Sequence, residues 1–433
     1  MLCLSAKSES LCFPIPTLII ALAVTTHFRK TLRKTIKIIL ILVSCFSYGQ
    51  GNGLYKFRAE NGKYGFMDET GEIKIKAEYI NVNDFSEGLC YVSKEVIKKG
   101  YKWVFIDTLG NKAFDIKDNF PETKFSNGFA RISSFEEHWF INRKGINEFG
   151  KTWIDGLGDF QNRYAVVSDK QFKEFYFIND KGQAVENFPK GNIRPFNDGF
   201  STYYKDGFFI IDSLGRQIGE KFNLIDGYRE GLFRVKNGGK WGFVDVNGNL
   251  VIDFIYEKDR RREFDEIRKL NTDSLDALPK ARLRNVSLFY EGLASYQDND
   301  LYGFINQENK VVIKPQFKKV NHFSEGFAGV SIDGKKWGFI DQTGVFVIEP
   351  NYFKVDSFEN GVCGVVINEQ EFEFANDYFI DALIDVKGKI LIETEMHCYL
   401  GFQGELIEYY GAPHFGGGIY YLNKNGEKIT PTE

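Results

Sequence analysis

The chain has 433 residues, of which 43% are hydrophobic and 26% charged, a balance that excludes extensive disorder. Its formal net charge of −4, from 55 basic and 59 acidic residues, offers no basic face for phosphates, so we expect no nucleic-acid partner. The 42 Phe, 22 Tyr and 43 Gly favour short strands joined by tight turns, because aromatics suit a pleated surface and glycine adopts positive φ.

The N-terminal region has the layout of an export signal. Basic residues over 29–37 precede an apolar run over 38–43, and small residues at Ser47 and Gly49 suit cleavage before Gln50. The apolar run is too short to span a bilayer, which needs about 20 residues. We therefore expect no transmembrane domain in the mature protein.

A lipid anchor is the alternative to simple cleavage. Residues 42–45 resemble a bacterial lipobox, in which Cys45 would be lipidated and become the mature N-terminus. Aromatic residues directly after Cys45 make us favour cleavage before Gln50. Both alternatives place the protein outside the cytoplasm, secreted, periplasmic or on the outer surface. We predict a leader and secretory signal peptide over 1–49, and the role of 1–28 stays open.

One pattern recurs through the rest of the chain: an aromatic residue, often before Gly, then Phe, an aliphatic residue, Asp or Asn, and a closing Gly. In one copy Trp241, Phe243 and Asp245 alternate with Gly242 and Val244, and a period of two is typical of a strand. The Asp and the closing Gly fit a hairpin turn that leads into a returning strand. The copies lie at 64–71, 103–110, 138–145, 175–182, 208–215, 241–248, 302–309, 337–344, 381–388 and 419–426.

A second anchor closes each unit: an aromatic residue, two mostly polar residues, Gly, and then an apolar strand. It occurs at 85–89, 125–129, 196–200, 228–232, 289–293, 323–327 and 358–362, with looser versions at 160–164 and 402–404. Each unit is thus about three short antiparallel strands, which can bury their aromatic face only against neighbouring units. The structural repeat anchors are expected to be Tyr64, Phe66, Trp103, Phe105, Trp241, Phe243, Tyr302, Phe304, Trp337 and Phe339.

These segments resemble a known family. Trp-Gly-Phe-Val-Asp at 241–245, Trp-Gly-Phe-Ile-Asp at 337–341 and Phe-Ser-Glu-Gly-Phe-Ala at 323–328 are similar to the WG (or KWG) repeat of bacteria. The resemblance covers nearly all of 52–430 and is strongest at 302–365. It implies an exported or surface-associated repeat module, with no catalytic residues to carry over. We predict an all-β domain of about ten WG repeats over 50–433.

The repeats could form a closed or an open array. Residues 53–57 match the segment that ends a repeat, and 419–429 match the segment that begins one. In a closed propeller-like or toroidal array such a split unit removes exposed sheet edges, although ten blades exceed the usual four to eight. An open β-superhelix is the rival, and both arrangements stay open.

The repeat pattern is interrupted over 257–287. A charge run at 258–263 is followed by Phe264, Ile267 and Leu270 at helical spacing. We predict a short, charged helical insertion within the sixth repeat. It would pack on the outside of the array or serve as a docking element for a partner.

The sequence lacks familiar catalytic and metal-binding patterns. No two of the five histidines share metal-ligand spacing, and the cysteines beyond the export segment, Cys90, Cys363 and Cys398, fit neither a disulfide framework nor a zinc site. We expect no cofactor and no metal. We also predict that the protein is not an enzyme.

We predict a non-enzymatic binding or protein-interaction scaffold at the bacterial cell envelope, with an unidentified protein or glycan partner. One alternative is a carbohydrate- or cell-wall-binding module, which would need solvent-exposed aromatics at Trp103, Trp241 or Trp337. Another alternative is a glycan hydrolase, which would need two carboxylates converging in a pocket.

Overall fold

The computed structural model describes residues 3–6, 9–12, 53–97, 100–117, 119–134, 137–153, 155–156, 158–168, 174–257, 285–368, 380–393, 399–410 and 419–432. The chain divides into two units, residues 1–50 and 51–433. In the first unit, β1 (Cys3–Ala6) and β2 (Glu9–Cys12) pair as an antiparallel hairpin. The predicted signal segment, with Cys45, lies outside the described residues. Within the described parts, no helix has the length and apolar character needed to cross a membrane.

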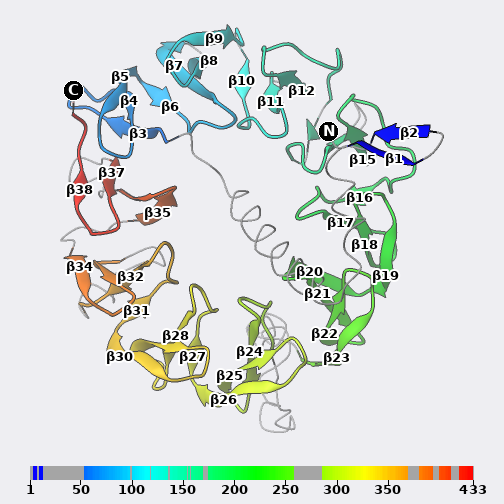
Figure 1. The fold of residues 1–433 in the computed structure, drawn as a ribbon, viewed down its shortest axis with the longest axis vertical. Coiled ribbons are helices and arrows are strands. Elements are labelled where there is room, and N and C mark those ends of the chain that lie inside the picture. The colour runs from blue at the N-terminus through cyan, green and yellow to red at the C-terminus, as the bar shows by residue number, and fades with distance from the viewer. Residues whose placement is uncertain are drawn as a thin grey trace, which may run out of the picture. The chain divides into compact units, whose positions relative to one another are not determined.

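In the second unit, consecutive strands pair antiparallel into ten small sheets among the described residues, one for each predicted repeat (Figure 1). The first five sheets comprise β3 (Tyr55–Arg58), β4 (Tyr64–Met67), β5 (Ile73–Tyr79); β6 (Asn81–Val82), β7 (Leu89–Ile97), β8 (Gly100–Asp107), β9 (Lys112–Asp115); β10 (Phe120–Pro121), β11 (Phe129–Ser133), β12 (His138–Asn142); β13 (Asp155–Gly156), β14 (Tyr164–Ser168), β15 (Phe175–Asn179); and β16 (Asn192–Ile193), β17 (Phe200–Tyr204), β18 (Phe208–Asp212), β19 (Gln217–Phe222).

The remaining five sheets follow in chain order. They comprise β20 (Leu224–Arg229), β21 (Leu232–Asn237), β22 (Lys240–Asp245), β23 (Leu250–Tyr256); β24 (Leu293–Asp298), β25 (Leu301–Asn306), β26 (Val311–Phe317); β27 (Lys319–Val320), β28 (Phe327–Ser331), β29 (Trp337–Asp341), β30 (Phe346–Tyr352); β31 (Lys354–Val355), β32 (Val362–Val366), β33 (Ala382–Asp385), β34 (Ile390–Glu393); and β35 (Tyr399–Gln403), β36 (Leu406–Tyr410), β37 (Ile419–Leu422), β38 (Lys428–Ile429).

Six of these sheets have four strands rather than the three that the repeat pattern predicts. In most of them the additional strand is a short one that precedes the aromatic anchor, such as β27 before Phe323. Two residues are too few to show a period of two, so the sequence pattern could not reveal such a strand. The turn between this strand and the next places the anchor aromatic against the core.

The Trp-Gly dipeptide has a definite steric role. A β-carbon added at Gly242 would lie 2.6 Å from the backbone oxygen of Ile252, on the neighbouring strand. The pairing of β22 with β23 shifts register between Trp241 and Phe243, so the outer strand bulges over the glycine. Glycine therefore permits a close backbone approach that any side chain would prevent.

The Asp or Asn of each repeat organises the following hairpin turn. Asp245 Oδ1 accepts hydrogen bonds from the backbone N–H groups of Asn247 (2.9 Å) and Asn249 (2.8 Å). Gly248 then adopts a φ of 86°. The same arrangement surrounds Asp107, Asp212, Asp341 and Asp385.

The core lies between neighbouring sheets. Phe243 of one repeat packs against Phe289, the anchor of the next, with ring centroids 5.0 Å apart. Equivalent pairs join Phe66 to Phe85, Phe304 to Phe323 and Phe339 to Phe358. Each repeat thus completes its aromatic core with a side chain of its successor.

The last sheet contacts the first in the same way as other neighbours contact each other. In a typical boundary, a β-carbon added at the turn residue Gly344 would lie 3.2 Å from Ile313, on the preceding sheet. At the boundary between the last and the first sheets, Gly71 lies against Thr430, and Thr432 exchanges two backbone hydrogen bonds with Gly71 and Ile73. In Figure 1, β37 (red) lies beside β3 (blue), and the two strands are in contact. We call this boundary the seam.

The predicted helical insertion cannot be compared with the structure. Residues 258–284 lie outside the described residues, and the described flanks at 257 and 285–287 are not helical. The predicted insertion therefore stays a prediction.

Candidate functional site

A row of mostly polar residues lies along one strand of each sheet. This is the inner strand, which follows the turn glycine, such as β7, β21 and β28. In five repeats, the N–H of the residue two before the anchor aromatic donates to the carbonyl of the third residue after the turn glycine, as in Asn83 to Tyr91 and Asn321 to Gly329. We call these positions, with the residue directly before each anchor, the polar belt. The third residue is polar in seven repeats and non-polar in three, and Arg163 and Glu405 stand in place of the turn glycine in the fourth and last repeats. The polar ones are Lys56, Tyr91, Arg131, Thr202, Arg234, Ser295 and Glu408, and the non-polar ones are Val166, Gly329 and Gly364.

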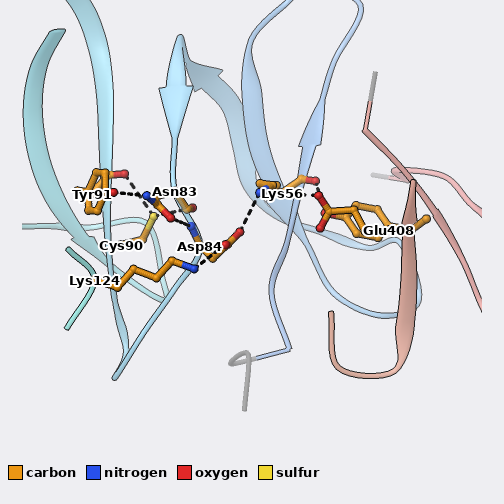
Figure 2. Close-up of polar contacts among 8 residues, drawn as sticks. Lys56, Asn83, Asp84, Cys90, Tyr91, Lys124 and Glu408 are labelled. Carbon is orange, nitrogen blue, oxygen red and sulfur yellow. Dashed lines mark hydrogen bonds and ion pairs between the residues drawn. The ribbon is translucent and has the colours of Figure 1, made fainter. Parts of the chain in front are cut away.

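At the seam the polar belt is an ion-pair network, which Figure 2 shows. Asp84 lies between two lysines: Lys56 Nζ is 3.0 Å from its Oδ1, and Lys124 Nζ is 2.7 Å from its Oδ2. Lys56 also lies 3.8 Å from Glu408 Oε1, on the last sheet. Four residues from the last sheet and the first three repeats are thereby joined.

The two lysines keep the Asp84 carboxylate ionised. Burial acts to raise the pKa of Asp84, but the hydrogen bond from Lys124 and the charge of Lys56 outweigh it and lower the pKa to about 2. Nearby, burial raises the pKa of the Cys90 thiol to about 12, and its Sγ donates to the Asn83 carbonyl at 3.0 Å. Cys90 is therefore a protonated, buried thiol rather than a reactive thiolate.

A second charged group lies in the third sheet. Glu122 accepts from Arg131 Nε at 2.6 Å and lies 2.9 Å from His138 Nδ1. Its backbone N–H donates to the Arg131 carbonyl, so it stands where other repeats carry Asn83 and Arg194. Burial acts to raise its pKa, but His138 and Arg131 lower it overall. His138, in the aromatic slot of its repeat, is thus held by its hydrogen bond with Glu122.

Two hollows open along the polar belt where the fifth to eighth repeats meet. One, of about 190 Å³, is lined among others by Arg194, Thr202 and Asp226. The other, of about 360 Å³, is lined among others by Asp226, Arg234 and His322. Because both share Asp226, we treat them as one groove and call it the belt groove.

A stack of flat side chains lies along the belt groove. The Arg229 guanidinium lies 4.0 Å from the centre of the Tyr290 ring, and His322 stacks on Tyr290 with centroids 4.1 Å apart. Burial and the charge of Arg229 lower the pKa of His322. His322 is therefore held mainly in its neutral form at pH 7.

The turns beside the belt are linked from repeat to repeat. The residue before each turn glycine has a positive φ, and where it is Glu its carboxylate accepts an N–H from the next repeat's turn. Glu291 Oε2, for example, accepts from Gly326 N–H at 2.8 Å, although Glu291 itself has a φ of 54°. Equivalent links join Glu87 to Gly128, Glu230 to Gly292 and Glu325 to Gly361.

The predicted repeat anchors lie in or beside the core, away from the belt groove. Phe66, Phe105, Phe243, Phe304 and Phe339 are all 1% exposed or less. Trp241 is 8% exposed, and the other four anchors, Tyr64, Trp103, Tyr302 and Trp337, are half-buried. None of these ten side chains lines either hollow.

Sequence reasoning missed the belt and its groove. The belt residues occupy equal positions in the repeats, yet their types differ from one repeat to the next, so no motif marks them. Aligning the repeats on their anchor aromatics and asking which positions vary in charge would have found them.

Known sequences and structures give the following comparisons. The family profile described as "WG containing repeat" matches residues 64–103, 208–241, 241–258, 302–335 and 337–370. No curated protein matches the sequence.

Similar solved structures include BamB from Moraxella catarrhalis, with 11% identity, a TM-score of 0.33 and coverage of 70% of this chain and 95% of BamB. Hsv2 of Kluyveromyces lactis has 12% identity, a TM-score of 0.30 and coverage of 62% and 92%. Apo AztD from Citrobacter koseri has 11% identity, a TM-score of 0.30 and coverage of 87% and 93%. The profile matches and the ten sheets agree on the repeat unit, and the chain contains WG-containing repeats at the five matched positions.

Proposed function

We propose that this protein is a non-catalytic scaffold, exported to the bacterial cell envelope, that binds a partner protein along the belt groove. The observation that carries the proposal is the groove itself, which runs over four successive repeats and is lined by polar side chains at equivalent positions. Repeat proteins commonly present such extended surfaces to partners.

The contacts at the seam support a closed, propeller-like arrangement of the ten sheets. Thr430 and Thr432 take the place that the outer strand of a preceding repeat takes elsewhere, and Tyr421 donates from its hydroxyl to the Lys56 carbonyl at 2.9 Å. A closed array leaves no terminal sheet face exposed and holds its surface rigidly. Rigidity lowers the entropic cost of binding.

A protein partner is a better fit than a glycan. The tryptophans that could stack on sugar rings are buried at Trp241 and half-buried at Trp103 and Trp337. The groove is instead lined by charged, amide and hydroxyl groups together with partly buried aromatics.

Site-specific photo-crosslinking in the producing cells tests this proposal. A photoreactive amino acid placed at Thr202 or Ser295, in the groove, is expected to give one discrete crosslinked protein in the envelope fraction. The same amino acid at the exposed Gln316, on outer strand β26, serves as the matched control and should not give it.

Absence of a groove-specific adduct, or recovery of the chain only from the cytoplasm, would overturn the proposal. The mass of the mature N-terminal peptide decides between cleavage before Gln50 and lipidation at Cys45.

A further inference from the structure

The belt groove has two exposed arginines beside it that form no ion pair among the described residues. Arg194 lines the first hollow and is exposed, and Arg229 is exposed at the Tyr290 stack. Neither has an ion-pair partner among the described residues, whereas Arg234 is paired with Asp226. Asp226 is the one carboxylate that lines either hollow, so two guanidinium groups remain available in a chain whose net charge is −4.

The structure holds Arg229 in place for binding. Its guanidinium lies flat on Tyr290, which in turn stacks on His322, so the arginine has a rigid platform. An arginine that stacks by its face keeps its N–H groups directed outward at the edge, where they match a carboxylate. Preorganisation of this kind reduces the entropy lost when the side chain binds.

The inner part of the groove contains a third arginine, Arg234, which is already paired with Asp226. Arg234 is mostly buried, stacks on Trp241 at 4.8 Å and donates to both Asp226 and the Val286 carbonyl. Its Nε has no hydrogen-bond partner among the described residues. A buried donor without a partner costs free energy, but this nitrogen is closed to solvent and is not a contact for a ligand in the groove.

We propose that the belt groove binds an acidic peptide segment of a partner protein, with carboxylates at Arg194 and Arg229. This inference rests on the proposed function and specifies the chemistry of its partner. Bidentate contacts between arginine and carboxylate supply charge selection. The amide of Asn321 and the hydroxyls of Thr202 and Ser295, which line the same hollows, are suited to the polar backbone of an extended chain.

A displayed library of 12-residue peptides tests the proposal on the full chain. Selection on the natural protein is expected to enrich Asp and Glu, and the selected peptides should bind more weakly as salt rises. The double variant R194Q/R229Q should bind them at least about tenfold more weakly. The matched control is R163Q/R216Q, which removes the same two charges from exposed turns outside both hollows. Thermal unfolding verifies that all variants are folded.

Each outcome has a definite meaning. Enrichment of basic or neutral peptides, or acidic peptides that bind R194Q/R229Q as well as the natural protein, would overturn the inference. So would tight binding of oligogalacturonate without peptide binding, because that result assigns the groove to acidic sugars. If groove crosslinks persist in cells while acidic peptides fail, the scaffold proposal stands and the inference alone is wrong.

Discussion

At the scale of single residues, Asp84 shows how the polar belt combines stability with charge. Its carboxylate is largely buried, which alone would disfavour the ionised form, yet two lysines from different repeats hold it charged. Removing one of these three side chains leaves the buried charge of the others without a partner, so contacts between several repeats are destabilised at once.

The stability that Asp84 provides should depend on pH. Its pKa falls from 3.8 to about 2 on folding, so its contribution is complete above about pH 4 and is lost as pH falls towards 2. D84N should therefore be less stable than the natural protein by about 1–2 kcal/mol at pH 7, and the difference should shrink between pH 4 and pH 2.

Urea unfolding at several pH values measures this difference. The control is D206N, which removes an exposed carboxylate paired with Lys221 on the surface. An equal loss of stability for D84N at pH 7 and pH 2 would contradict the assignment.

At the scale of the element, the turns before the inner strands are the least expected feature. Glutamate is a poor choice for a left-handed position, where Asn, Asp or Gly is favoured. The structure accounts for the choice, because each such Glu reaches the turn of the next repeat and accepts its glycine N–H. The hydrogen bond between sheets thus offsets the backbone strain of the left-handed Glu.

Two substitutions at Glu291 separate the link from the strain. Ala shares the left-handed cost of Glu but cannot reach Gly326, so E291A should lose about 1 kcal/mol through the missing hydrogen bond alone. Gly also loses the link but adopts positive φ freely, so E291G should be more stable than E291A by about 1 kcal/mol. Chemical denaturation gives both values. Equal stability of E291A and the natural protein would show that the link contributes nothing.

Much at this scale could be predicted from the sequence. The alternation around Phe243 predicts the strand, and Asp245 with Gly248 predicts the hairpin turn, because these signals are local. The carboxylate link of Glu291 could not be predicted, since it joins turns 35 residues apart and needs the packing of two sheets. The belt groove escaped for the same reason: its residues come together only when four repeats are stacked.

At the scale of the whole repeat domain, the proposed closed arrangement rests on the seam. Gly71 has a φ of 92°, and a β-carbon there would lie 2.4 Å from the Thr430 carbonyl oxygen. The sequence could suggest closure, because the terminal segments match complementary halves of a repeat, but it could not decide it. Whether the array closes depends on the sum of the bends at the ten boundaries between sheets, which no single repeat encodes.

The variant G71A tests the seam against G361A. Gly361 also has positive φ, at 81°, but open space around the position of an added β-carbon. G361A should lose about 1 kcal/mol from backbone strain alone, and G71A should lose clearly more, by about 2 kcal/mol or above, from the added collision. Differential scanning calorimetry compares them. Similar losses for both variants would contradict the closed arrangement.

The repeated use of one boundary contact has a consequence for evolution. Because the joint at Gly71 and Thr430 resembles the joint at Gly344 and Ile313, duplication or deletion of a whole repeat creates no new kind of interface. Chains with fewer or more units can then close with the same chemistry, provided that the bend at each joint adjusts. The side chains of the polar belt can diverge at the same time, so proteins of this one architecture can acquire many binding specificities.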